Sequence, residues 1–257
     1  MILRLRATCC ALAALVPAQA LAITGNAPGA SGAAGKAIVM LVDRRENLCT
    51  ATAIARDIVL TAAHCVMRGG DYQVQVSRNG AVAYVAKVAV HPNFNSAAYN
   101  ASRATADVAL VKLETRLPPE VVPAGLAPPG GVNVGDRLTI AGFGVVAARS
   151  SSELGTPRQA TLSVTGKPGS LQIRLIDPAT GGNRPGLGAC TGDSGGPAFS
   201  GGAVIGVVSW STAPQLEEGC GGMTGVTPLT LYRPWILEQA RKFGASLAPE
   251  KVPAEPK

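Results

Sequence analysis

The stretch Thr191-Gly-Asp-Ser-Gly-Gly-Pro197, in the last third of a 257-residue chain, places one serine among three glycines. Glycines at positions −2, +1 and +2 from Ser194 allow a sharp turn and a close approach of the backbone to a ligand. Consecutive N–H groups in such a turn can point into one concavity and stabilise an anion. Composition alone indicates an ordinary Gly/Ser/Pro loop. A serine is weakly nucleophilic until a base takes its proton, so Ser194 can act as a nucleophile only if the chain also supplies that base.

The chain has two histidines that could serve as this base. His91 lies in a Pro/Asn turn, which indicates an exposed structural residue. His64 lies at the end of an apolar strand, in the segment TAAHC at 61–65. If Cys65 bonds Cys49, the disulfide closes a ring of 65 − 49 = 16 positions, which contributes about 3 kcal/mol in the loop-closure model. Because such a bridge also restrains the imidazole, His64 is the better candidate.

A group that orients the base must be buried or half-buried. Most acidic residues of this chain fall in turns or in the polar C-terminal tail, whereas Asp107 begins the apolar strand DVALV at 107–111. A carboxylate that enters a core must be hydrogen-bonded or paired. An imidazole N–H is a suitable partner, and it fixes the tautomer in which the other ring nitrogen faces the serine.

Composition and pattern predict an all-β protein. A content of 47% hydrophobic and 15% charged residues excludes disorder, and the length suits one large or two small domains. Short β-type runs separated by Gly/Pro/Asn turns are expected at 37–42, 50–55, 58–61, 72–77, 82–90 and 108–113, and again at 137–142, 159–164, 171–176, 204–210 and 225–227. The Pro/Gly-rich stretch 118–131 is the linker candidate, and only the C-terminal end, from Pro234, has helical spacing. The pattern therefore indicates two β halves of about six strands each and one C-terminal helix.

Residues 1–22 have the features of a secretory signal peptide. Arg4 and Arg6 form a basic region, an apolar run follows at 7–16, and small residues give A-x-A cleavage sites that end at Ala22. A retained anchor helix is the alternative, disfavoured because the run is short and Pro17 interrupts it. We expect a secreted or periplasmic protein with no membrane segment in its mature form. The Ala-rich signal is typical of a bacterial protein.

Four cysteines follow the signal, at Cys49, Cys65, Cys190 and Cys220. An even number in an oxidising compartment predicts two disulfides, and the residues alone leave three connectivities open. A zinc site is not expected, because there is no C-x-x-C pair and only two histidines are present. The net charge of +7 falls to 7 − 2 = +5 without Arg4 and Arg6, and the basic residues are scattered. Nucleic-acid binding is therefore not expected.

Three motifs together resemble the chymotrypsin/trypsin family of serine endopeptidases: TAAHC at 61–65, DVAL at 107–110 and GDSGGP at 192–197. The chain order His, Asp, Ser separates this resemblance from subtilisins and α/β-hydrolases. It covers about residues 23–247 and implies an all-β, chymotrypsin-like fold of two six-stranded antiparallel β-barrels with a C-terminal helix. The first barrel would span 23–130 with His64 and Asp107, the second 131–247 with Ser194, and 248–257 would be a disordered tail.

The resemblance implies a role for each motif residue. Ser194 would be the nucleophile, His64 the general base and then acid, and Asp107 the residue that orients His64. The N–H groups of Gly192 and Ser194 would form the oxyanion hole. Ser209 would hydrogen-bond Asp107. The implied disulfides are Cys49–Cys65 and Cys190–Cys220.

The resemblance also locates a substrate pocket. Its residues would be Gly188, Ala189, Ser209, Trp210, Ser211 and Gly225. With Gly188 at the base, where an acid would select Lys or Arg, the pocket is neutral and should prefer apolar side chains, narrowed by Ser211. The loop 211–219 is longer than usual for the family, and it carries Glu217 and Glu218. These carboxylates could reach a basic residue at the pocket mouth, although solvated loop charges are the favoured interpretation.

The family also implies an activation device. A new N-terminus beginning with Ile or Val pairs its α-amino group with the Asp before the serine, here Asp193. Ile23 lies 64 − 23 = 41 residues before His64, close to the family spacing, and cleavage after Ala22 would expose it. Signal removal would then mature the enzyme directly. The alternative is that Ile23 is simply the first residue of a strand.

The resulting hypothesis is a monomeric secreted serine endopeptidase that cleaves polypeptides through an acyl-enzyme and needs neither cofactor nor metal. A single carboxylate around Asp71 is too few for a calcium loop. One alternative is a catalytically silent relative that binds a partner, although such a protein would usually lose a triad residue or the oxyanion glycine. Another is a β-rich carbohydrate or adhesion module in which the motifs coincide by chance.

Overall fold

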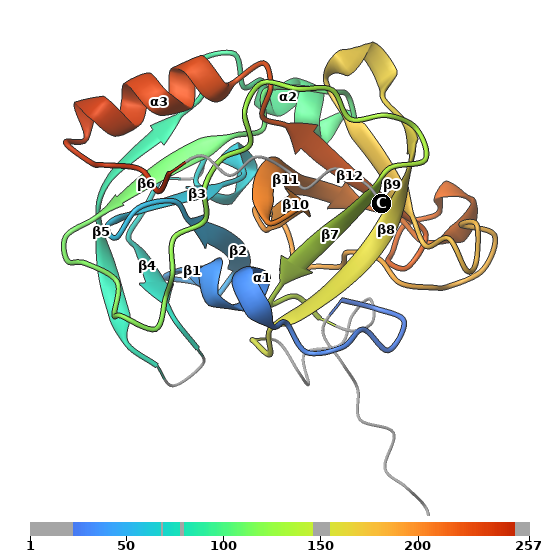
Figure 1. The fold of residues 1–257 in the computed structure, drawn as a ribbon, viewed down its shortest axis with the longest axis horizontal. Coiled ribbons are helices and arrows are strands. Elements are labelled where there is room, and N and C mark those ends of the chain that lie inside the picture. The colour runs from blue at the N-terminus through green and yellow to red at the C-terminus, as the bar shows by residue number, and fades with distance from the viewer. Residues whose placement is uncertain (1–22, 68, 78–79, 146–154, 250–257) are drawn as a thin grey trace, which may run out of the picture.

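Twelve strands, in the part of the chain that the structure describes, close into two antiparallel barrels of six strands each (Figure 1). This part comprises residues 23–67, 69–77, 80–145 and 155–249 of a computed structural model. In Figure 1 the first barrel lies on the left, in blue to green, and the second on the right, in olive green to red. The predicted fold class is confirmed.

The first barrel has the strand order β1-β2-β3-β6-β5-β4. Its strands are β1 (Ile38–Asp43), β2 (Leu48–Ala53), β3 (Ile58–Thr61), β4 (Tyr72–Gln75), β5 (Val82–Val90) and β6 (Ala109–Leu113). Alternate side chains point inward, so that Val39, Leu41, Val59 and Val111 meet in one buried cluster. β3 and β6 pair in antiparallel register with Thr61 opposite Ala109, which brings the end of β3 beside the start of β6.

The second barrel has the strand order β10-β11-β12-β9-β8-β7. Its strands are β7 (Arg137–Gly142), β8 (Arg158–Gly166), β9 (Ile173–Ile176), β10 (Pro197–Ser200), β11 (Ala203–Ser211) and β12 (Met223–Pro228). The sequence pattern did not predict β10, because Gly/Pro turn residues flank its short apolar run. This strand begins three residues after Ser194, and it anchors the serine turn to the second barrel.

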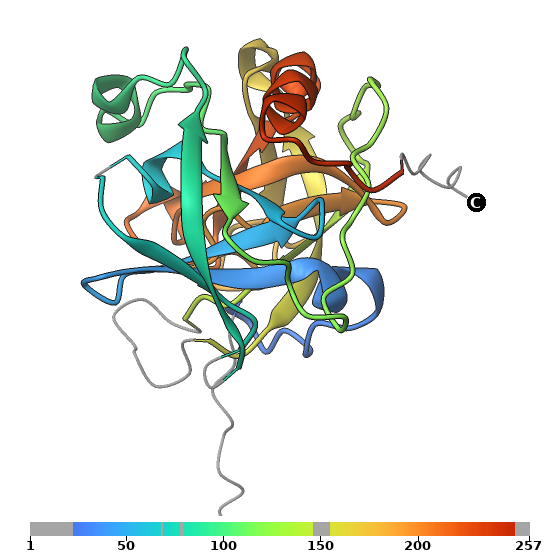
Figure 2. The same cartoon turned by 90° about the vertical axis from the view of Figure 1, so that its left-hand side faces the viewer.

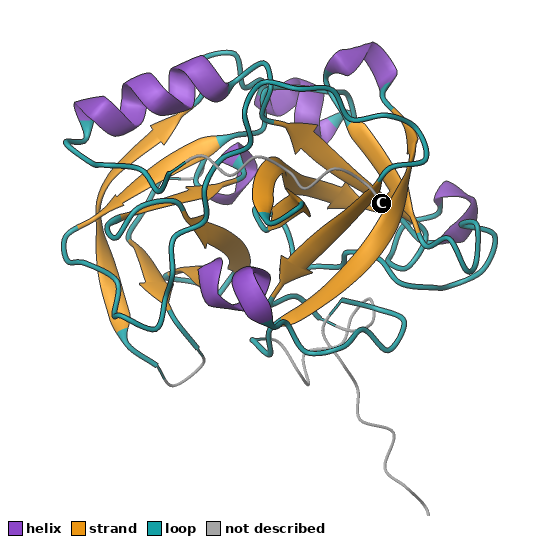
Figure 3. Cartoon of the chain, in the orientation of Figure 1, coloured by secondary structure: helices purple, strands orange, loops and turns teal. Residues whose placement is uncertain are grey.

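The helices lie outside the two barrels (Figure 3). They are the α-helices α1 (Gly32–Ala37), α2 (Ser96–Asn100) and α3 (Arg233–Lys242), with short 3-10 helices η1 (Ala63–Cys65), η2 (Pro168–Ser170) and η3 (Pro214–Leu216). The predicted C-terminal helix α3 is confirmed. The expectation that only the C-terminal end is helical is wrong, because α1 and α2 are helical too. The sequence did not reveal them because they are too short to show a periodic pattern.

Helix α3 packs with the first barrel rather than with the barrel that precedes it in sequence (Figures 1 and 2). Its buried residues Ile236 and Ala240, one helical turn apart, join the same apolar cluster as Ile54 and Phe143. Beyond the helix, the Ala248 N–H donates a hydrogen bond of 2.8 Å to the Ile54 carbonyl. The C-terminal segment thus ties the two barrels together.

A prediction about one irregular segment needs correction. His91 is buried, with its ring edge-on to Tyr232 and Trp235 at centroid distances of 4.9 Å, so the expectation of an exposed residue is wrong. The turn exposes Asn93, whose backbone N–H donates to His91 Nδ1. The imidazole of His91 itself points inward, and burial lowers the pKa of His91.

The stretch 118–131 connects the two barrels, as the sequence predicted. Several of its apolar residues pack into the cores, among them Val121, Ala124 and Leu126.

Residues 1–22 and 250–257 lie outside the described residues, so the signal-peptide prediction and most of the predicted tail fall where the structure describes nothing. Among the described residues, no helix combines the length and apolar character needed to cross a membrane.

Candidate active site

His64 and Asp107 meet because of the pairing between β3 and β6. His64 lies in η1, three residues after the end of β3, and Asp107 lies two residues before β6 begins. The His64 Nδ1 is 2.8 Å from Asp107 Oδ2, and the backbone N–H of His64 donates to Asp107 Oδ1 at 2.9 Å. Because a carboxylate only accepts hydrogen bonds, Nδ1 carries the hydrogen and Nε2 is left as an acceptor.

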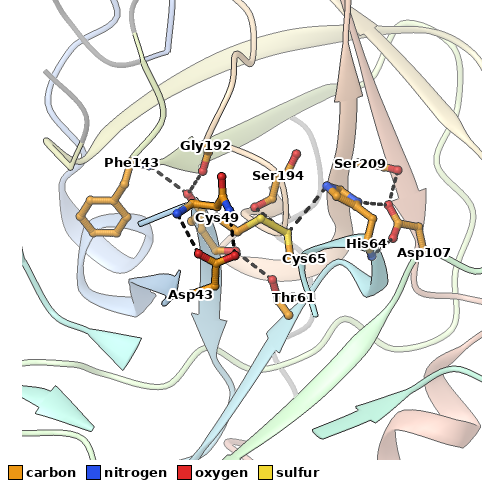
Figure 4. The surroundings of a disulfide bond; sticks show 12 residues. Asp43, Cys49, Thr61, His64, Cys65, Asp107, Phe143, Gly192, Ser194 and Ser209 are labelled. Carbon is orange, nitrogen blue, oxygen red and sulfur yellow. Dashed lines mark hydrogen bonds and ion pairs between the residues drawn. A yellow bond between two sulfur atoms is a disulfide. The ribbon is translucent and has the colours of Figure 1, made fainter. Parts of the chain in front are cut away.

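The Asp107 carboxylate is 1% exposed and receives one further hydrogen bond, from Ser209 Oγ at 2.5 Å. Ser209 lies on β11, so this contact crosses from the second barrel to the first (Figure 4). Three donors compensate the carboxylate for the water that it loses. The predicted Ser209–Asp107 hydrogen bond is present.

Ser194 lies in a tight turn that is pressed against the first barrel. The Ser194 carbonyl accepts a hydrogen bond of 2.8 Å from the Thr50 N–H, and Thr50 Oγ1 donates to the Gly192 carbonyl at 2.8 Å. Gly195 has φ +84°, and a β-carbon there would overlap Thr61 Oγ1 and the Thr50 carbonyl. Glycine is required at 195 by both backbone conformation and space. Thr50, which the sequence did not single out, thus holds the serine turn from the neighbouring barrel.

The same turn presents unused backbone donors. Gly192 has φ +95°, and within the described residues neither the Gly192 N–H nor the Ser194 N–H donates to a protein acceptor. Two such N–H groups in one turn are suited to bind an anionic oxygen. Ser194 Oγ and His64 Nε2 share no hydrogen bond among the described contacts, and Nε2 lies 3.7 Å from Cys65 Sγ (Figure 4). Such bonds are often long before a substrate is bound.

A cleft of about 460 Å³ contains both His64 and Ser194. Of the residues predicted to bind substrate, Ala189, Ser209, Trp210 and Ser211 also line it. Gly188 and Gly225 do not: Gly188 is packed against Gly221, and Gly225 lies under the indole of Trp210. The structure therefore brings most of the predicted pocket residues to the cleft, but not its expected base.

The long loop 211–219 is tied back onto β12. The Thr212 N–H donates to the Met223 carbonyl at 2.9 Å, and Ser211 Oγ donates to the Gly219 carbonyl at 3.3 Å. Glu217 and Glu218 are exposed, and neither lines the cleft. Their geometry agrees with the interpretation as solvated loop charges.

Tyr99 is a cleft residue that the sequence analysis missed. Its ring stacks on the His64 imidazole with centroids 4.5 Å apart and an interplanar angle of 15°. Burial, together with the negative charge of Asp107, raises the pKa of Tyr99 to about 12. The Asn95 cap, which accepts the Ala98 N–H at 2.9 Å, was a readable signal for helix α2. The stacking itself depends on tertiary contacts.

Asp193 is 1% exposed and has no cationic partner among the described residues. Its carboxylate accepts from the Cys190 N–H at 2.9 Å and from the Gly144 N–H at 2.8 Å. Burial raises the pKa of Asp193 to about 7, although these two hydrogen bonds oppose the shift. Ile23 is fully buried in the core of the same barrel, and the next residue, Thr24, donates its N–H to the Gly188 carbonyl at 3.0 Å.

Two disulfides flank the site, Cys49–Cys65 and Cys190–Cys220. The first fixes the chain beside His64, and the second fixes the chain three residues before Asp193. The structure thus selects one of the three connectivities and confirms the pairing implied by the resemblance. Cys49, His64 and Cys65 cluster closely enough to suggest metal ligands, but the two sulfurs are bonded to each other and offer no thiolate.

Comparisons with known proteins agree with this geometry. The family model described as Trypsin matches residues 23–236. Human kallikrein-15 is 29% identical over 79% of this chain and 86% of its own length, and trypsin alpha of Drosophila melanogaster is 28% identical over 94% and 98%. Among solved structures, human heparin binding protein and neuropsin, a serine protease of mouse brain, each give a TM-score of 0.67. They are 21% and 23% identical, cover 83% of this chain and 95% and 98% of their own, and show a shared fold.

Proposed function

The chain belongs to the trypsin family and is a trypsin-like serine protease, and from this premise we propose that it is a secreted endopeptidase that hydrolyses peptide bonds through an acyl-enzyme on Ser194. The observation that carries the proposal is the buried Asp107 carboxylate, hydrogen-bonded to His64 Nδ1 in a cleft that also contains Ser194. This arrangement leaves His64 Nε2 as a proton acceptor on the cleft side.

The reaction uses the side chains of Ser194, His64 and Asp107 and two backbone N–H groups of the serine turn. Ser194 Oγ attacks the substrate carbonyl carbon while His64 Nε2 takes the hydroxyl proton, and Asp107 stabilises the imidazolium that forms. The Gly192 and Ser194 N–H groups donate to the oxyanion, and removal of one such donor costs roughly 100- to 1,000-fold in turnover. His64 then gives its proton to the leaving amine, the acyl group stays on Ser194, and water activated by His64 releases it.

Covalent labelling tests the nucleophile. A fluorophosphonate probe should label the processed, disulfide-intact protein and should fail to label Ser194→Ala, because that variant keeps the fold and lacks only the attacking oxygen. Equal labelling of both proteins, or of neither, would contradict the assignment. The second outcome would favour the catalytically silent binding module, which the comparisons with trypsin and kallikrein do not support.

Maturation is proposed to follow from signal removal. Cleavage after Ala22 would give Ile23 a free ammonium group. No described residue gives the buried Asp193 a cation, and a buried carboxylate is costly without one. N-terminal sequencing of the secreted protein should find Ile23. A stable, fully active protein that begins at Leu21 would show that the ion pair is unnecessary.

Specificity is proposed to follow from a neutral pocket. Position 188 is a glycine rather than an acidic residue, and Glu217 and Glu218 are exposed and do not line the cleft. The enzyme should therefore prefer substrates with an apolar residue immediately before the cleaved bond. Discrimination among them would be modest, because one buried methylene contributes only about 0.8 kcal/mol. Cleavage of a panel of peptides that differ in the residue before the cleaved bond tests this proposal. Dominant cleavage after Lys or Arg would contradict a neutral pocket. Polypeptides are the proposed substrates of a monomeric enzyme.

A further inference from the structure

The indole of Trp210 lies directly on Gly225. Trp210 on β11 stands opposite Gly225 on β12, and residues opposite each other in an antiparallel pair project on the same side of the sheet. A β-carbon built on Gly225 would overlap the indole at Cε2, Nε1 and Cδ2. The ring therefore fills the space in front of this glycine, which is one of the residues predicted to form the substrate pocket.

Gly188, the predicted base of the pocket, is closely packed as well. A β-carbon on Gly188 would find Gly221 Cα at 3.3 Å and Thr224 Oγ1 at 3.5 Å, so even a methyl group there would already touch its neighbours. The main-chain hydrogen bonds between Thr212 and Met223, and between Gly222 and Thr212, hold the end of β11 against β12. These contacts keep Trp210 close to Gly225.

Among the described residues, none makes a polar contact that fixes the indole in this position. Its Nε1–H donates no hydrogen bond to another described residue, and the side chain is half-buried. Within this part of the chain the ring is held by apolar contact, which a competing apolar side chain can replace. When the ring moves aside, the substrate side chain that replaces it would lie beside the Ser211 hydroxyl and the backbone of Gly225.

We propose that Trp210 gates the primary pocket by occupying it, so that a methyl-sized substrate side chain binds with the indole in place and a bulky apolar side chain binds only after displacing it. This inference rests on the proposed function and refines its pocket. Displacement uses part of the binding energy of a large side chain, so the enzyme should favour alanine over phenylalanine immediately before the cleaved bond.

The test compares two peptide p-nitroanilides that differ only in this residue, Ala or Phe. Trp210→Ala should raise the Phe/Ala ratio of kcat/KM by at least 10-fold, whereas the matched control Trp235→Phe, in helix α3 and outside the cleft, should leave the ratio unchanged. A large aromatic over a glycine also stabilises a sheet. That structural role alone would lower Tm and slow both substrates equally, so an unchanged ratio overturns the gate.

A second measurement covers the case in which Trp210→Ala does not fold. The chain contains two tryptophans, so Trp235→Phe leaves Trp210 as the only indole fluorophore. Binding of 2-phenylethylboronic acid should shift its emission, and methylboronic acid should not. An identical response to both acids overturns the gate. Diisopropyl fluorophosphate separates this failure from failure of the proposed function, because absence of labelling at Ser194 in the unmodified enzyme would mean that there is no reactive serine to gate.

Discussion

The imidazole of His64 is stacked on the phenol ring of Tyr99, with ring centroids 4.5 Å apart and planes inclined by 15°. One face of the proposed base is thereby covered by a side chain from helix α2. Tyr99→Ala should lower kcat/KM by roughly 3- to 10-fold, since stacked aromatic pairs contribute about 0.5–1.5 kcal/mol. Tyr99→Phe keeps the ring and should retain near-normal activity. Steady-state kinetics check both variants, and equal losses would show that the hydroxyl, rather than the stacking, is responsible.

The hydrogen bond from Ser209 Oγ to Asp107 Oδ2 predicts a second effect. Among the described contacts, Ser209→Ala leaves the buried carboxylate with the two donors of His64, and hydrogen bonds to charged groups contribute about 1.5–3 kcal/mol. We expect kcat/KM to fall by about 10- to 100-fold, with a lower Tm. Ser163→Ala, on β8 and outside the cleft, is the matched control. If the control loses as much activity, the effect is a general consequence of losing a strand serine and does not come from Asp107.

The buried Asp193 predicts how stability changes with pH. Its pKa is raised from 3.8 to about 7, so between these pH values the folded chain holds a proton that the unfolded chain has released. The free energy of unfolding should therefore fall as pH rises from about 4 to about 7, by on the order of a few kcal/mol, in a form that retains Ala22. In the form that begins at Ile23, the ammonium would lower the pKa of Asp193 and remove this fall.

Urea unfolding of both forms between pH 4 and 8 measures the difference. Burial lowers the pKa of His91 in both forms, so its contribution cancels in the comparison. Asp193→Asn in the Ala22-retaining form should abolish the fall. Identical pH dependence in the two forms would show that the N-terminus and Asp193 are not coupled.

Much of the site could be predicted because its residues lie in short, local patterns. His64 follows a strand, Asp107 precedes one, and Ser194 lies among glycines, so each environment could be read from a few neighbours. Strand periods likewise located eleven of the twelve strands in the described chain. β10 was missed because turn residues surround it, and its strand conformation depends on pairing with β7 and β11.

What the sequence did not predict depends on contacts between distant segments. The His91 turn looked exposed because nothing local shows that Tyr232 and Trp235 cover it. Gly225 was expected to line the substrate pocket, but the structure places it under Trp210, from a neighbouring strand. Such contacts are set by barrel closure and strand register, which local patterns do not encode.

The Cys190–Cys220 disulfide connects the serine turn to the end of the loop 211–219, and it gives a last prediction. Its ring of 30 positions corresponds to about 3.5 kcal/mol in the loop-closure model, so Cys190→Ser/Cys220→Ser should have a markedly lower Tm. The Cys190 N–H also donates to Asp193 Oδ2, so loosening this residue should disturb the Gly192 and Ser194 donors. We therefore expect kcat/KM to fall more than 10-fold at a temperature where the variant is still folded by circular dichroism. A lower Tm with unchanged kcat/KM would mean that the serine turn is held by Thr50 and Asp193 alone, and that the disulfide stabilises the fold without shaping the anion site.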